Sequence, residues 1–257
     1  MSELDNLFDL TGKRALITGS TQGIGNTLAK GLASVGAEIV INSFNEQEVE
    51  TVKSQLIDQG ITAYGLVFDV TKRDEVDKAI NDFEANVGPI DILVNNAGIQ
   101  LRAPLEDFDP DDFDRLMRTN VNSVFYVSQS VARHMIKRKA GKIINIASVQ
   151  SALARPSIAP YTASKGAVSN LTKGMTTDWA KYGLQINALA PGYIVTPLTQ
   201  SLVDDPEFSA WLCNRTPANR WGRTKELVGT CVFLSANASN FINGQTIYVD
   251  GGITACI

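Results

Sequence analysis

The chain of 257 residues has few of the residues on which several enzyme classes depend. It contains one histidine, His134, and three cysteines, Cys213, Cys231 and Cys256. A single histidine excludes a Ser-His-Asp hydrolase and a histidine-based zinc dehydrogenase. The cysteines lack the spacing of a metal site, and their odd number is typical of reduced thiols in the cytoplasm. We therefore expect no metal ion.

Long hydrophobic runs and an excess of one charge are also missing. No apolar stretch has transmembrane length, and no apolar signal region follows a basic start. The net charge is -4, with lysines and arginines scattered along the chain. We expect a soluble, cytoplasmic protein that binds neither nucleic acid nor a membrane. Without a Pro/Ser/Gly-rich linker or an internal repeat, residues 1–257 are predicted to form a single domain.

What the chain does contain is a regular alternation of strands and helices. Helical patterns lie between nearly every pair of predicted strands, and this alternation is typical of a parallel sheet covered on both faces. The fold class is therefore α/β, a doubly wound Rossmann-type domain with a seven-stranded parallel sheet, in which ligands bind beyond the carboxyl ends of the strands. The strands are predicted at 14–18, 38–42, 63–68, 91–95, 142–146, 185–189 and 246–249.

A glycine-rich loop follows the first predicted strand directly. A helical pattern with Leu28, Leu32 and Val35 comes next, and the second strand, 38–42, completes a βαβ unit. Backbone amides of such a loop and of the helix N-terminus can hold a pyrophosphate, so the loop predicts a dinucleotide site. The residues predicted to bind there are Gly19, Ser20, Thr21, Gln22, Gly23, Ile24 and Gly25.

Tyr161 and Lys165 stand four residues apart and so share one face of a predicted helix. A free phenol titrates near pH ~10, and a buried cation beside it lowers its pKa. Lys165 is predicted to do this, so that Tyr161 moves a proton near neutral pH. Asn120 falls between Met117 and Val124 in the apolar stripe of a helix predicted near 111–138. A buried asparagine needs partners, either neighbouring backbone groups or a water and the lysine.

Three groups of residues together resemble a known family over essentially the whole chain. Residues 18–25 read TGSTQGIG, and residues 95–98 read NNAG. Both motifs are similar to those of the short-chain dehydrogenase/reductase family, whose members transfer a hydride between a nicotinamide cofactor and a secondary alcohol or ketone. The family's catalytic tetrad is matched by Asn120, Ser148, Tyr161 and Lys165.

The resemblance implies a role for each member of the tetrad. Ser148 would hold the substrate oxygen while Tyr161 gives or takes a proton. Lys165 would lower the tyrosine pKa and bind the nicotinamide ribose, and Asn120 would link the lysine to a proton-relay water.

The resemblance also implies further cofactor contacts. Asp69, at the end of the third strand, would contact adenine, and residues 191–194 with Thr196, after the sixth strand, would contact the nicotinamide carboxamide. A simple strand-end cap is an alternative role for Asp69. The implied residues are Asp69, Val70, Asn96, Ala97, Gly98, Pro191, Gly192, Ile194 and Thr196.

The choice between NADP(H) and NAD(H) depends on the end of the second strand. NAD enzymes usually place an acid there to bind the ribose 2'-hydroxyl, but this chain has Asn42, Ser43 and Phe44. The arginine or lysine usual in NADP enzymes is missing too, since the candidate positions hold Gln22 and Phe44. The loss of a repelling carboxylate, with Ser43 able to bind a phosphate, favours NADP(H) over NAD(H).

The loops at 95–104, 148–156 and 211–222 look like those of gluconate 5-dehydrogenases, a group within the family that interconverts gluconate and 5-ketogluconate. Arg102, Arg155 or Arg215 could bind the carboxylate of a sugar acid. The segment from about 195 to 220 falls where the family places a mobile substrate lid. The predicted substrate residues are Arg102, Gln150, Ser151, Arg155, Tyr193 and Trp211.

Ala152 departs from this pattern, because the gluconate enzymes tend to carry glutamate there, and the loss could shift the pocket toward less hydroxylated ketones. A carbonyl reductase or polyol dehydrogenase therefore stays open. A 3-oxoacyl carrier-protein reductase would want a basic patch near the cleft, and a non-catalytic dinucleotide-binding protein conflicts with an intact tetrad. The family likeness further implies a homotetramer, assembled through the helices near 111–138 and 161–181 and the tail 241–257.

Overall fold

A parallel sheet of seven strands is the frame of the computed structural model, which describes residues 3–256. The strand order is β3-β2-β1-β4-β5-β6-β9, and each neighbouring pair is parallel. The predicted doubly wound α/β fold is confirmed; residues 1, 2 and 257 of the predicted domain and interface tail lie outside the described residues. The strands are β1 (Arg14–Ile17), β2 (Glu38–Ser43), β3 (Ala63–Val67), β4 (Ile92–Asn95), β5 (Gly141–Ile146), β6 (Leu184–Pro191) and β9 (Thr246–Val249).

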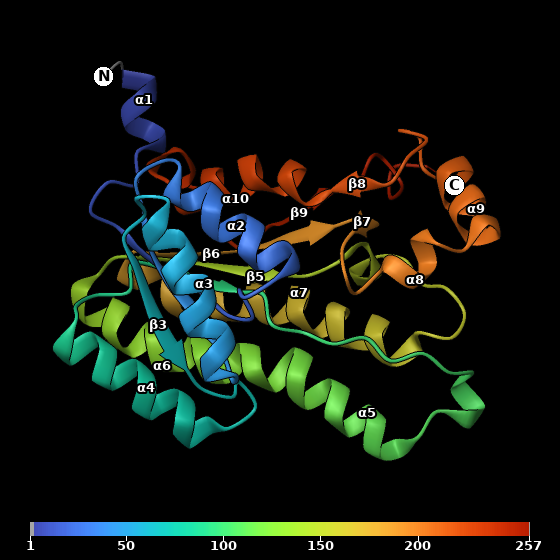
Figure 1. Cartoon of the computed structure of the whole chain (residues 1–257), viewed down its shortest axis with the longest axis horizontal. Coiled ribbons are helices and arrows are strands. Elements are labelled where there is room, and N and C mark those ends of the chain that lie inside the picture. Colours follow the sequence, from blue (N-terminus) through green and yellow to red (C-terminus); the bar gives the residue numbers. More distant parts are fainter. Residues whose placement is uncertain (1–2, 257) are drawn as a thin grey trace.

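Helices cover both faces of this sheet. Consecutive strand residues point to opposite faces, so Leu16 packs in one core cluster while its neighbours Ala15 and Ile17 pack in the other. Both faces of the sheet are buried, which explains why the strands are continuous apolar runs. One face is covered by α2 (Gly23–Ala33), α3 (Glu46–Asp58) and α10 (Val228–Ser235), and the other by α4 (Arg73–Asn86), α6 (Ser123–Arg138) and α7 (Ala159–Trp179) (Figure 1).

The long helix predicted near 111–138 is interrupted. It consists of α5 (Pro110–Met117), a π-helical turn (Arg118–Asn122) and α6, and the residues at both joints keep helical backbone angles. A π turn inserts one residue into the helical ladder and is common at functional positions. Here it contains Asn120, whose side chain is fully buried.

A small sheet missed at the sequence level lies beyond the carboxyl end of β6. Its strands, β7 (Ile194–Val195) and β8 (Gly222–Arg223), are two residues long and pair in parallel. Two short helices, α8 (Gln200–Val203) and α9 (Pro206–Arg215), connect them at the end of the molecule where the C-terminus lies (Figure 1). The remaining helical elements are α1 (Glu3–Phe8), η1 (Leu105–Asp107), η3 (Val149–Ser151), η4 (Ala180–Tyr182), η5 (Thr224–Leu227) and η6 (Asn237–Ser239).

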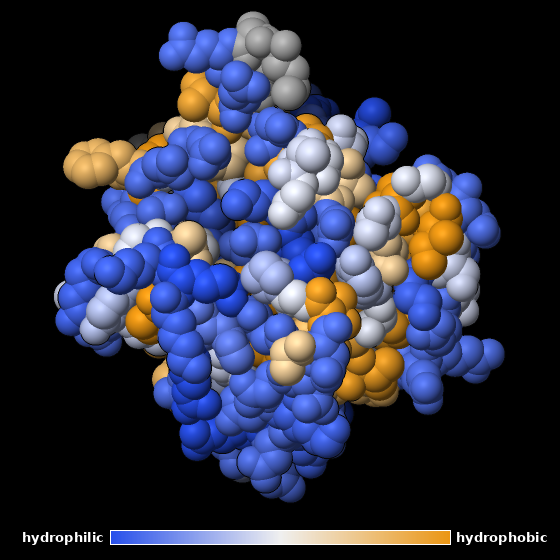
Figure 2. Space-filling view, turned by 90° about the vertical axis from the view of Figure 1, so that its left-hand side faces the viewer, coloured by the Kyte–Doolittle hydropathy of each residue, from blue (hydrophilic) through white to orange (hydrophobic). Residues whose placement is uncertain are grey.

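The end of the molecule away from α9 carries mostly hydrophilic side chains, with apolar ones in separate patches (Figure 2). Within residues 3–256, no helix is both long and apolar enough to span a bilayer. The cytoplasmic location stays a prediction.

Lys142 is a buried lysine at the start of β5, at the opposite end of this strand from Ser148. Its side-chain nitrogen donates to the Ser239 hydroxyl at 3.3 Å and to Asn240 Oδ1 at 2.8 Å. Burial lowers the pKa of Lys142 from its ordinary 10.5 to about 8, because no carboxylate in the described chain forms an ion pair with it.

We predict that Lys142 makes stability depend on alkaline pH. Between pH 8 and 10.5 the unfolded chain binds the Lys142 proton and the folded chain releases it, so the free energy of unfolding rises with pH. Lys142→Met should remove this contribution, roughly 2 kcal/mol between pH 7.5 and 10. Urea unfolding of both proteins at the two pH values measures the difference. An equal rise in both proteins would contradict the prediction, and Lys173→Met, at an exposed position of α7, is the control.

Candidate active site

A cavity of about 1190 Å³ opens at the carboxyl edge of the sheet. Its wall is made by the loops that follow β1, β2, β3, β4, β5 and β6. The order of the sheet reverses between β1 and β4, so the loops after these strands diverge and leave a crevice there. The cavity therefore lies where a doubly wound sheet binds ligands.

The glycine-rich loop forms one end of this cavity. Gly19 and Gly23 adopt φ angles of +60° and +58°, which are costly for residues with a side chain. A Cβ atom on Gly25 would lie 2.5 Å from the Gly19 carbonyl oxygen, so only glycine lets α2 approach the loop this closely. Gln22, the N-cap of α2, makes no side-chain cap, which leaves the first amides of the helix for an anion. The loop thus fits the pyrophosphate of a dinucleotide.

Not all seven predicted loop residues face the cavity. Ser20 is fully buried; its hydroxyl donates to the Ile17 carbonyl at 2.7 Å and accepts from the Asn42 amide at 3.0 Å. Gly25 lies behind the loop, whereas Gly19, Thr21, Gln22, Gly23 and Ile24 line the cavity.

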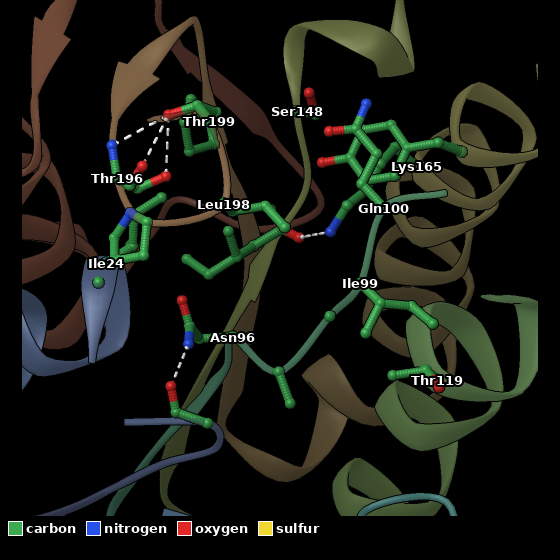
Figure 3. Close-up of a pocket in the computed structure, with 18 of the residues that line it drawn as sticks. Ile24, Asn96, Ile99, Gln100, Thr119, Ser148, Lys165, Thr196, Leu198 and Thr199 are labelled. Atoms are coloured by element: carbon green, nitrogen blue, oxygen red, sulfur yellow. Dashed lines mark hydrogen bonds between the residues drawn. The ribbon is translucent and has the colours of Figure 1, made fainter. Parts of the chain in front are cut away.

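Hydrogen bonds fasten the glycine loop to the loop after β4. The Thr18 hydroxyl accepts from the backbone amides of Asn96 and Ala97 at 3.0 and 3.1 Å. The Asn96 side chain donates to the carbonyls of Thr18 and Gly19, both at 2.9 Å; Figure 3 shows one hydrogen bond of this side chain. Asn96, Ala97 and Gly98 all line the cavity. Two segments almost 80 residues apart in the chain therefore form one wall of the cavity.

Ser148, Tyr161 and Lys165 lie together on another wall of the cavity. Ser148 follows β5 and begins η3, and the other two residues lie in the first turns of α7. The Lys165 nitrogen donates to the Ile146 carbonyl at 2.8 Å and lies 5.6 Å from the centre of the Tyr161 ring. Figure 3 shows Ser148 and Lys165 side by side across the pocket from Asn96.

Burial shifts the pKa values of Tyr161 and Lys165 in opposite directions. Burial raises the pKa of Tyr161 to about 12, and its hydrogen bond with Ser148 offsets only part of that rise. The charge of Arg102 lowers this pKa too, whereas Tyr193 raises it. Burial also lowers the pKa of Lys165 to about 8. Lys165 is not among the groups that lower the pKa of Tyr161 here, since its ammonium is directed to the Ile146 carbonyl. The lowering of the tyrosine pKa by Lys165 stays a prediction.

Asn120 does not contact Lys165 directly. Its Oδ1 accepts from the Ile99 amide at 2.8 Å, and its Nδ2 donates to the Ile99 carbonyl at 2.9 Å and the Ser164 hydroxyl at 3.2 Å. The side chain thus joins the loop after β4 to α7, so the backbone partners considered from the sequence are present. Its link to a water and the lysine stays a prediction.

The adenosine end of the cavity contains the predicted residues Ser43, Asp69 and Val70. Asp69 Oδ1 accepts from the amide and the hydroxyl of Thr71, both at 2.8 Å. This side chain therefore caps the end of β3, as the alternative interpretation held, and also faces the cavity.

An acidic residue missed at the sequence level lies at this same end. Glu48, on the first turn of α3, lines the cavity, and its Oε2 accepts from the hydroxyls of Thr21 at 2.9 Å and Ser43 at 3.3 Å. The available signal was Asn45 followed three residues later by glutamate, which is typical of a helix N-terminus. An acid is thus missing from the end of β2 but is supplied by the next helix.

The opposite end is formed by the segment after β6. Pro191, Gly192, Ile194 and Thr196 line the cavity there as predicted. The Thr199 hydroxyl donates to the Ile194 carbonyl at 2.7 Å and accepts from the Thr196 amide at 3.0 Å, which folds the segment back on itself (Figure 3).

Of the predicted substrate residues, Gln150, Arg155 and Tyr193 line the cavity and contact one another. The Tyr193 hydroxyl accepts from Arg155 Nε at 3.1 Å and from Gln150 Nε2 at 3.4 Å. Arg102 is exposed and does not line the cavity; partial desolvation lowers its pKa, and the nearby charge of Arg155 lowers it further. These residues form a polar cluster beside Tyr161.

The other candidate substrate residues lie outside the cavity lining. The Ser151 hydroxyl donates to the Lys165 carbonyl at 3.0 Å, so it supports α7 and does not line the cavity. The opposite face of α9 points into the protein, so Trp211 is 47% exposed. Its ring packs against that of Phe208. Arg215 bonds to the backbone and sulfur of Cys256 at the surface. Ala152 is exposed outside the cavity lining.

Across residues 3–256 no three histidine, cysteine, aspartate or glutamate side chains are grouped as a metal site would require.

The sequence was also compared with families and proteins that are already known. The model of the family described as short chain dehydrogenase matches residues 13–207. Gluconate 5-dehydrogenase of Gluconobacter oxydans (strain 621H) is 60% identical over 252 residues, which cover 98% of both chains. The 5-keto-D-gluconate 5-reductase of Escherichia coli (strain K12) is 50% identical over 254 residues, 99% of this chain and 100% of the relative.

A solved structure shows the same likeness in three dimensions. The gluconate 5-dehydrogenase from Burkholderia cenocepacia J2315, in complex with NADP and tartrate, superposes with a TM-score of 0.98 at 60% identity, covering 99% of this chain and 100% of that one. The fold, the loop motifs and these matches together lead to one conclusion: the chain belongs to the short chain dehydrogenase family.

Proposed function

We propose that this protein interconverts 5-ketogluconate and gluconate with NADP(H) as the favoured cofactor. The observation that carries the proposal is the cavity itself, which Ser148, Tyr161 and Lys165 line together with the glycine loop and Arg155, with Arg102 nearby. Relatives named for this chemistry, at 50% and 60% identity over nearly the whole chain, support the substrate. The neighbouring structure that holds NADP supports the cofactor.

The cavity residues would divide the dinucleotide among them. Amides of the glycine loop and of the first turn of α2 would bind the pyrophosphate, and Lys165 the nicotinamide ribose. When bound, the nicotinamide supplies or accepts the hydride. Ser43, Asp69, Val70, Asn96, Ala97 and Gly98 would contact the adenosine half, and Pro191, Gly192, Ile194 and Thr196 the nicotinamide half.

Ser148 and Tyr161 would handle the proton. In the reductive direction both hydroxyls donate to the carbonyl oxygen of the substrate, and the Tyr161 proton moves to that oxygen as it becomes an alkoxide. A pKa near 12 keeps the phenol protonated at neutral pH, which suits an acid. Asn120 is proposed to connect Lys165 to the water that restores the proton.

Arg102 and Arg155 would bind the carboxylate of the sugar acid. The charge of Arg155 lowers the pKa of Arg102, and neither arginine forms an ion pair with an acid among residues 3–256. Two unneutralised cations beside a reaction site favour a bidentate anionic ligand. Gln150 and Tyr193 would bind hydroxyl groups of the substrate. The tartrate in the related structure is likewise a hydroxylated carboxylate.

We further propose that residues 195–220 form the substrate lid of a single domain, because Leu198 and Leu202 line the cavity.

For assembly we propose a homotetramer. Its support is the set of large apolar side chains exposed on elements expected at the interfaces, namely Phe113, Phe125 and Phe241, the last of them completely exposed.

The proposed function predicts turnover of 5-ketogluconate. NADPH oxidation, followed at 340 nm, should be fast with this substrate and slower with NADH at equal concentration. Cyclohexanone, which lacks the carboxylate and hydroxyls, serves as the control ketone. If neither cofactor is oxidised with 5-ketogluconate while a simple ketone is reduced, the sugar-acid proposal is wrong and a general carbonyl reductase takes its place.

The second prediction concerns proton transfer. Tyr161→Phe removes only the hydroxyl and should lower kcat by about 10² to 10⁴-fold, while NADPH affinity, measured by fluorescence titration, changes little. Tyr182→Phe, at a partly exposed site in η4, should leave both unchanged. Wild-type gluconate oxidation should also accelerate from pH 7 to pH 10, because the base form of a phenol with a pKa near 12 becomes more abundant. Full activity of the Tyr161 variant would refute the assigned role.

The third prediction concerns the arginines. Arg102→Met and Arg155→Met should each raise the KM for 5-ketogluconate by about tenfold or more, as expected for a charged hydrogen bond of roughly 1.5 to 3 kcal/mol. Reduction of cyclohexanone should be unaffected, since it has no carboxylate. Arg215→Met is the matched control, because Arg215 bonds to Cys256 away from the cavity. Equal effects on both ketones would show that the arginines only maintain the fold.

A further inference from the structure

Glu48 occupies the end of the cavity where the adenosine ribose would lie. Its Oε2 joins the glycine loop to the end of β2 by accepting from the Thr21 hydroxyl at 2.9 Å and the Ser43 hydroxyl at 3.3 Å. Its Oε1 accepts from Asn45 Nδ2 at 3.3 Å. All three partners are neutral, so the carboxylate keeps its full negative charge.

Among residues 3–256 no lysine or arginine forms an ion pair with Glu48. Next to the main cavity lies a smaller hollow of about 430 Å³, whose lining within the described chain contains no lysine or arginine. Phe44, the side chain after Ser43, is 78% exposed at the cavity rim and is likewise neutral. The lining of this hollow consists of Thr21, Gln22, Asn45, Gln47, Glu48, Thr51 and Val52.

We propose that Glu48 sets how strongly the protein distinguishes NADP(H) from NAD(H), by opposing the 2'-phosphate and accepting a hydrogen bond from the 2'-hydroxyl. The inference rests on the proposed dinucleotide function and assigns a specificity role to one residue within it. The protein is then expected to use NADH as well as NADPH, because Glu48 weakens the binding of the 2'-phosphate, which only NADP(H) carries.

Two physical effects act in the same direction. A carboxylate beside a phosphate dianion is repelled, and like charges brought together in a binding site weaken binding strongly. The hydroxyls of Thr21 and Ser43, the natural donors to a phosphate here, have their protons directed to Glu48. A 2'-hydroxyl needs neither of these donors, since it can itself donate to the carboxylate.

Binding of two nucleotide fragments tests the role without any turnover. 2',5'-ADP carries the 2'-phosphate, whereas 5'-AMP carries the 2'-hydroxyl, and isothermal titration of the full chain measures both dissociation constants. Glu48→Gln should bind 2',5'-ADP at least about tenfold more tightly and 5'-AMP equally or more weakly. The gain over wild type should shrink from 50 mM to 500 mM NaCl, as a charge effect requires and a structural effect does not.

Glu46→Gln is the matched control, because Glu46 lies on the same first turn of α3 and loses the same charge but does not line either cavity. If both fragments bind but their affinity ratio changes less than twofold in Glu48→Gln, or changes equally in Glu46→Gln, the role of Glu48 is refuted and the dinucleotide function stands. If the wild type and both variants bind neither fragment nor NADPH, the proposed function fails together with the inference.

Discussion

The parallel pairing of the seven strands is the constraint on which the rest of the structure depends. Because all strands run the same way, the loops after β1 to β6 meet at one edge of the sheet. The reversal of strand order between β1 and β4 keeps those loops from covering each other. Residues as distant in the chain as Gly19, Asn96 and Ser148 thereby line one cavity, and the hydrogen bonds of Asn96 to Thr18 and Gly19 fix two of its walls together.

Burial at that edge gives the central side chains unusual acid-base properties. The same loss of solvation that raises the pKa of Tyr161 lowers that of Lys165, because burial disfavours the charged form of both groups. The two hydrogen-bonding neighbours, Ser148 and the Ile146 carbonyl, restrain their positions. A dinucleotide with negative phosphates would change this balance, because it would bring charge that the lysine can pair with.

Charge is distributed unevenly along the cavity, and this distribution separates its two recognition tasks. Arg102 and Arg155 place positive charge beside Tyr161, where a sugar acid would present its carboxylate. At the opposite end Glu48 places negative charge against the ribose position, among hydroxyl and amide groups. In the proposed function, the substrate end would favour an anion, whereas the adenosine end would weaken the binding of a 2'-phosphate.

The sequence by itself determined the strand positions, the glycine loop and the order of the catalytic residues. Buried strands are continuous apolar runs, and motif residues follow them directly, so both features are local in the chain. Local patterns do not specify β7 and β8, two residues long, or the π turn at Asn120, since tertiary contacts hold these elements in place. Only the tertiary structure decided that Ser151, Trp211 and Arg215 lie away from the cavity lining while Glu48 lies on it. The physical reason is that the fold of each loop at the sheet edge decides which side chains line the cavity. The position of a residue in the sequence does not specify that fold.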